Sequence, residues 1–83
     1  MDRKTFDAIM NTVSVENTDS DSVVNATIQK YGSLSIGMSD VNNYFYTADI
    51  QELIDGGITV EDLELARRNG WAIKDENTIF KTF

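Results

Sequence analysis

YFYTADIQELIDGGITVEDLELARRNGWAIKDENTIFKTF, residues 44–83, is the stretch around which the chain is organised. Its aromatic start favours a strand, and its middle carries two segments in which apolar residues recur with helical spacing. Gly56-Gly57 separates these segments, and two short apolar runs joined by a polar loop follow them. The expected elements are a strand, two helices and the two strands of a hairpin, over residues 44–47, 48–55, 60–69, 71–74 and 78–82.

Cap signals mark the expected ends of the two helices. Thr47 is placed to cap the first helix, and Thr59 stands three residues before Asp62 with the spacing of a capping box. Gly70 suits the left-handed residue that ends a helix. Asn69-Gly70 is also typical of a tight hairpin turn, but the helical period before it favours a helix end. The apolar positions expected to be buried are Ile50, Leu53, Ile54, Val60, Leu63 and Ala66.

The N-terminal segment predicts an amphipathic helix over residues 2–13, with Asp2 placed to cap it. Its apolar stripe consists of Phe6, Ile9, Met10 and Val13. A helix this short needs a surface to pack on. The stripe is expected either to join the core, which we favour, or to dock on another chain.

Residues 14–22 are small and polar, which favours a loop that ends in a cap at Asp19 or Ser20. The apolar spacing that follows predicts a helix over residues 21–31. Gly32 is expected to end this helix in the left-handed conformation.

Small and apolar residues alternate over residues 33–38, which favours a strand solvated on one face, and residues 39–43 are typical of a turn. Residues 33–47 are therefore expected to form a full hairpin, or regular structure in their second half alone. Tyr44, Phe45, Tyr46 and Trp71 are expected to supply core area, with a stacking platform for bases as the alternative.

This order of elements resembles the winged helix-turn-helix architecture, in which a helix, a strand, two helices and a two-stranded wing follow one another. The run LARRNGW before a short hairpin is similar to a recognition helix that leads into its wing. The resemblance implies an α+β fold, namely a small helical domain with a short antiparallel hairpin, here preceded by the N-terminal helix. It also implies a DNA-binding regulator, whose contacts would come from Arg67, Arg68, Lys74 and Lys81.

Charge disfavours that use of the fold. The chain of 83 residues carries 14 acids and 7 bases, a net charge of −7, which repels phosphate backbones. Acids also occupy the start of the would-be recognition helix. We therefore expect DNA to be an improbable partner and a protein with a basic surface to be the leading one. Small acidic inhibitors of phages and mobile elements offer an analogy of size and charge.

The candidate protein-binding residues are acids that fall between residues 49 and 64 with no base among them. They are Asp49, Glu52, Asp55, Glu61, Asp62 and Glu64. A solvated helix face with acids at two helix starts is the alternative interpretation. A third hypothesis is a small structural or oligomerising domain, for which a homodimer through the helix over residues 2–13 is the natural form.

The composition argues against catalysis. Without cysteine or histidine, the chain lacks the thiolate and imidazole ligands and the commonest general base. The runs that begin at Asn17 and at Asp40-x-Asn42 lack the later oxygen ligands of a calcium loop, and Gly56-Gly57 lacks the pattern of a phosphate loop. A Ser–Lys pair stays open. We expect one cytoplasmic domain with no catalytic residue, metal or cofactor, and no association with a membrane.

Overall fold

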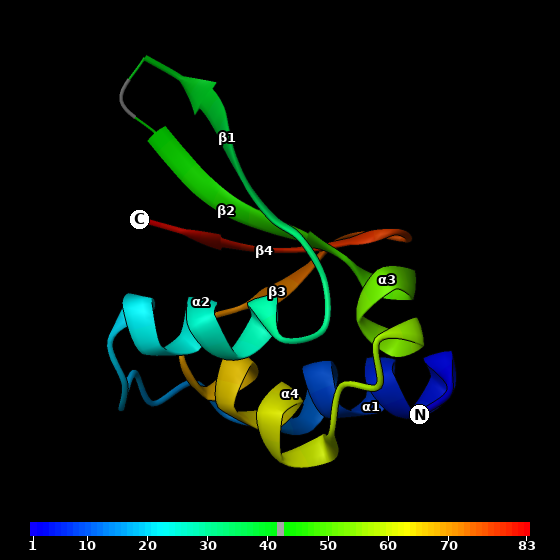
Figure 1. Cartoon of the computed structure of the whole chain (residues 1–83). Coiled ribbons are helices and arrows are strands. Elements are labelled where there is room, and N and C mark those ends of the chain that lie inside the picture. The colour runs from blue at the N-terminus through cyan, green and yellow to red at the C-terminus, as the bar shows by residue number, and fades with distance from the viewer. Residues whose placement is uncertain (42) are drawn as a thin grey trace.

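The computed structural model describes residues 1–41 and 43–83, and in these residues the chain adopts an α+β fold (Figure 1). The helices gather on one side of an antiparallel sheet, and the hairpin β1–β2 extends away from them. In chain order the elements are α1 (Arg3–Thr12), α2 (Asp21–Gln29), β1 (Leu34–Asp40), β2 (Asn43–Asp49), α3 (Ile50–Asp55), α4 (Val60–Arg68), β3 (Ala72–Asp75) and β4 (Thr78–Thr82). The α+β class predicted from the sequence is confirmed.

The sheet is larger than the short hairpin of the predicted fold, because the hairpin over residues 33–47 joins the C-terminal hairpin in one sheet. Its strand order is β1-β2-β4-β3, because β2 pairs with β4 as well as with β1. Both strands of the first hairpin form, with one register shift between Met38 and Asp40, so the fuller of the two expectations for residues 33–47 is correct. The turn predicted over residues 39–43 is too wide, because Asp40 and Asn43 belong to paired strands. Asn42, which is part of that predicted turn, lies outside the described residues.

The core lies between the sheet and the helices. Its members come from every helix, from β2, from β4 and from the segments that flank α4; they are Phe6, Met10, Val24, Ile28, Ala48, Ile50, Leu53, Ile58, Leu63, Ala66, Trp71 and Ile79. Helix α1 thus contributes two core residues, as the favoured interpretation of its stripe predicts. Trp71 is fully buried, whereas Tyr44 is 42% exposed, so the core role predicted for the aromatic triplet is wrong for Tyr44.

The start of α3 differs from the prediction. Thr47 lies within β2 opposite Phe80, and the strand continues to Asp49, which pairs with Thr78. Asp49 therefore caps α3 in place of Thr47, and its carboxylate accepts a hydrogen bond from the Glu52 amide at 2.9 Å. The ladder between β2 and β4 holds residues 48–49 extended, which local helix signals could not reveal. The helix predicted over residues 48–55 is correspondingly shorter.

The burial predicted for Val60 and the left-handed conformation predicted for Gly32 are also wrong. Val60 is 47% exposed, and Ile58 in the preceding turn takes the buried position instead. Helix α2 ends at Gln29, and Gly32 is not left-handed, since the only described glycines with positive φ are Gly57 and Gly70.

Several predicted caps are confirmed. Asp2, Ser20 and Thr59 each accept a hydrogen bond from the amide three residues ahead, and Gly70 has φ of 99° after the end of α4. These bonds satisfy amides that the first turn of a helix leaves without partners. Within the described residues, no helix has both the length and the apolar character that crossing a bilayer would require.

Candidate functional site

The acidic residues lie on α3, on α4 and at the end of β2 that leads into α3; we call the set Asp49, Glu52, Asp55, Glu61, Asp62 and Glu64 the acidic helix surface. The segment that follows α2 contacts both helices. The amide of Ser33 donates a hydrogen bond to the Glu52 carboxylate, and the Tyr31 hydroxyl donates one to the Asp62 carboxylate. Two of the predicted site residues therefore hold α2 against α3 and α4.

The hydrogen bond from Tyr31 is the main cause of a raised pKa of its phenol, above the ordinary value of 10.0, and partial burial adds to the effect. The neutral phenol is the donor, so the bond persists as long as the proton remains on the hydroxyl. The same contact occupies one oxygen of Asp62.

Two further members of the surface have local partners. Asp49 caps α3, and Asp55 accepts a hydrogen bond at 2.9 Å from Nε2 of the Gln51 side chain, one turn earlier. Glu61 is exposed and Glu64 is half-buried. Neither Glu61 nor Glu64 has a side-chain hydrogen bond or an ion pair within residues 1–41 and 43–83, so both carboxylates are available to solvent or to a partner.

The acidic helix surface lacks neutralising cations. The ion pairs of the described residues are Arg3–Asp7, Lys74–Asp75 and Lys81–Asp21, none of which includes a member of this surface. No lysine or arginine occurs between Tyr31 and Ala66. Across the same residues, no group of three or more acids converges closely enough to hold a metal ion.

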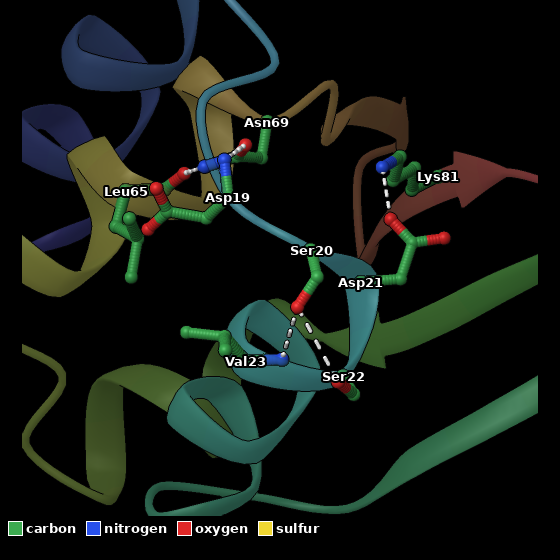
Figure 2. Close-up of polar contacts among 8 residues, drawn as sticks. All are labelled: Asp19, Ser20, Asp21, Ser22, Val23, Leu65, Asn69 and Lys81. Carbon is green, nitrogen blue, oxygen red and sulfur yellow. Dashed lines mark hydrogen bonds and ion pairs between the residues drawn. The ribbon is translucent and has the colours of Figure 1, made fainter.

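The basic residues of the DNA-binding alternative are largely engaged within the fold. Arg67 donates from Nε to the Val13 carbonyl oxygen at 3.1 Å and from Nη1 to the Trp71 carbonyl oxygen at 3.0 Å. Figure 2 shows Lys81 reaching Asp21 at the start of α2.

The other two basic residues are freer. The Nζ atom of Lys74 lies 3.8 Å from Oδ2 of Asp75 and over the ring of Phe45. Arg68 is half-buried, and its side chain has no partner in the part of the chain that is described. The structure thus leaves Arg68 and Lys74 as the accessible cations of this set.

Two features escaped the sequence analysis. Asn69 is fully buried. Its side chain accepts a hydrogen bond from the Asp19 amide at 2.7 Å and donates one to the Leu65 carbonyl oxygen at 2.9 Å. Figure 2 shows this residue between the loop and α4.

The second feature is a row of aromatic and aliphatic side chains on the hairpin and at the C-terminus. We call Ile36, Met38, Tyr44, Tyr46 and Phe83 the arm stripe. In the sequence, the only sign of this stripe is that small and apolar residues alternate over residues 33–39 without a charge.

Comparison with known protein families, with curated proteins and with solved structures finds no match to this chain. The described residues also enclose no pocket. What the acidic helix surface and the arm stripe could bind therefore follows from their own residues alone.

Proposed function

We propose that this chain is a small, non-enzymatic binding module that docks through the acidic helix surface on a basic surface of a partner protein. The observation that carries the proposal is that the six carboxylates have no ion-pair partner within the described residues. Carboxylates without a cation nearby leave uncompensated negative charge on α3 and α4, which a partner that supplies cations would neutralise. Complementary charge also accelerates the encounter with such a partner.

The six residues divide into two roles under this proposal. Glu52 and Asp62 bind the segment that follows α2, and Asp49 caps α3. Asp55, Glu61 and Glu64 are those whose replacement leaves these contacts in place. The partner chemistry is a basic protein surface of the kind that also binds nucleic acid, which such an inhibitor would cover.

The fold proposed for the module is a winged helix. Helix α2, strand β2, the pair α3–α4 and the hairpin β3–β4 follow in the order of that architecture, which supports the proposal. Helix α1 and strand β1 are then additions to the common arrangement. Acids in the first turn of α4 favour protein over DNA as what the module contacts.

A DNA-binding regulator is the second candidate, and the order of elements favours it. Its contacts with phosphates would rest mainly on Arg68 and Lys74, since Arg67 and Lys81 already bind within the fold. Two accessible cations make a weak electrostatic footprint. Retention of the purified chain on duplex DNA at low ionic strength, decreasing steeply with added salt, would favour this candidate over the first.

The test of the leading proposal compares two double variants with the same change in net charge. Glu61→Lys with Glu64→Lys alters the acidic helix surface, whereas Glu16→Lys with Glu76→Lys alters exposed acids in two loops. Each chain is used to capture protein from nuclease-treated host extract at several salt concentrations. We expect the wild type and the loop variant to retain the same protein, and the helix variant to lose it.

Circular dichroism of both variants is the control for folding, and both are expected to match the wild type. Equal capture by the two variants would contradict the proposal. So would capture by the wild type that occurs in untreated extract and is lost in nuclease-treated extract.

A further inference from the structure

The hairpin β1–β2 carries an exposed apolar face beyond the reach of the helices (Figure 1). Ile36 is 64% exposed and Met38 is 58% exposed, and they lie opposite Tyr46 and Tyr44 in the ladder. Phe83 completes the same face, with its ring stacked on that of Tyr46 at a centroid distance of 4.2 Å. This face is the arm stripe. It continues the core-facing side of the sheet outward, where no element of the described chain covers it.

The free edge of β1 differs from the other edge of the sheet. Strand order β1-β2-β4-β3 leaves β1 and β3 as the edges. The β3 edge is short and carries Lys74 and Asp75, which are charges of the kind that discourage pairing between molecules. In contrast, no charged residue and no proline occurs from Ser33 to Ser39. The ladder with β2 shifts register between Met38 and Asp40, a kind of irregularity that discourages edge pairing. From Leu34 to Met38 the β1 edge is regular and carries neither charge nor proline, so this part lacks the usual protection.

The direction of the main-chain groups along β1 follows from one hydrogen bond. The Phe83 amide donates to the Tyr44 carbonyl oxygen at 3.1 Å, so the main-chain groups of Tyr44 face β4. Because these groups alternate along an antiparallel strand, those of Phe45 face β1 and bond its partner Gly37. The amides and carbonyls of Ile36 and Met38 then point to the open edge.

The residues at this edge are symmetric about Gly37. The run Ser35-Ile36-Gly37-Met38-Ser39 has the same residue class at equal distances on either side of the glycine. A twofold axis at Gly37 would set Ile36 opposite Met38 of a second copy, and both pairs would exchange main-chain hydrogen bonds. The apolar side chains of the two copies would share one face.

We propose that β1 pairs antiparallel with β1 of a second copy of this chain about Gly37, which joins two sheets and brings Ile36 and Met38 of the two arm stripes into contact. A twofold interface requires a self-complementary surface, which the run about Gly37 supplies. Charge points the same way: Asp40 is the only charged residue from Ser33 to Ala48, in a chain of net charge −7. Two copies meet there with little of the repulsion that the acidic helices would cause.

This dimer uses a surface separate from the acidic helix surface, and its test needs no other partner. Sedimentation equilibrium of the purified full chain over a wide concentration range is expected to show a monomer–dimer equilibrium. Ile36→Lys places two like charges in the paired strands and should raise the dissociation constant at least about tenfold. The control is Val15→Lys, which makes a similar change at a 45% exposed residue in the loop after α1 and should leave the constant unchanged.

The register is tested with thiols, since the natural chain contains no cysteine. Chains carrying Ile36→Cys are mixed with tagged chains carrying Met38→Cys and oxidised. Directly opposed residues suit a disulfide, whereas the diagonal separation of about 7–8 Å between like positions exceeds its reach. The mixed disulfide should therefore form in preference to either self-linked product.

The proposal is overturned by a chain that stays monomeric at its highest soluble concentration, by equal loss of association in the Val15→Lys control, or by cross-linking with no preference for the mixed pair. The proposal is also overturned if the chain is a monomer whose β1 edge binds an extended peptide of another protein.

Discussion

The carbonyl group of Tyr31 lies against Gly56, so that a β-carbon on this glycine would overlap the carbonyl oxygen and come 2.8 Å from the carbonyl carbon. Gly56 follows α3 with φ of −74°, a conformation that any residue can adopt. Its smallness, and not its backbone freedom, is therefore what the fold uses. This close approach lets the end of α2 reach both α3 and α4.

Gly56→Ala is expected to lower the free energy of unfolding by about 3 kcal/mol, because the methyl group would overlap the main chain of Tyr31 and force backbone to move. The control is Gly57→Ala, where a β-carbon meets open space but φ is 84°, which should cost about 1 kcal/mol from conformation alone. Urea denaturation measures both. A Gly56→Ala variant as stable as the wild type would show that α2 does not abut this turn.

Tyr31→Phe removes the hydrogen bond to Asp62 and should produce a small loss of stability at neutral pH. The raised pKa of Tyr31 also predicts a dependence on alkaline pH. Its stabilising effect is complete below the unfolded value of 10.0 and is lost as the pH rises through the higher folded value. Thermal unfolding between pH 8 and about 12 should show this loss in the wild type and a smaller one in Tyr31→Phe. Tyr44→Phe, on the hairpin, should behave as the wild type does.

Asn69→Ala should cost about 2–3 kcal/mol, because it leaves the Asp19 amide and the Leu65 carbonyl without their side-chain partner (Figure 2). Asn69→Asp distinguishes the two bonds. It keeps an acceptor for Asp19 but turns a buried carboxylate oxygen toward a carbonyl oxygen. Its deficit relative to the wild type should be large at pH 7 and should shrink on acidification, as protonation restores a donor. An unchanging deficit from pH 7 to about 4 would contradict this assignment.

Asp2 caps α1 by accepting a hydrogen bond from the Thr5 amide at 2.8 Å, and this bond lowers the pKa of the carboxyl group. A lowered folded pKa contributes stability above the unfolded value of 3.8, and that stability is lost as the pH falls through the folded value. Asp2→Asn preserves a capping oxygen without a titrating proton, so it should reduce the acid sensitivity of unfolding. Asp2→Ala should lower stability at neutral pH as well. Identical acid profiles for the wild type and Asp2→Asn would refute the role of this carboxylate.

The candidate sites were only partly predictable. All six acids of the acidic helix surface are visible in the sequence as a run without bases, yet nothing local shows that Glu52 and Asp62 would be bound by Ser33 and Tyr31. The same holds for Arg67, whose guanidinium bonds the distant Val13 carbonyl. A side chain's partner across the fold is set by packing, so composition overstates how many charges are free.

What the sequence determined by itself is local. The caps at Asp2, Ser20 and Thr59 and the left-handed Gly70 follow from groups a few residues apart, so their signals survive in a single chain. Tertiary structure decided the rest. Pairing of β2 with β4 joins residues about thirty or more positions apart, and it kept Asp49 in a strand. The burial of Ile58 in place of Val60 also appears only in the folded chain. These outcomes depend on which surfaces meet, and that is a property of the folded chain as a whole.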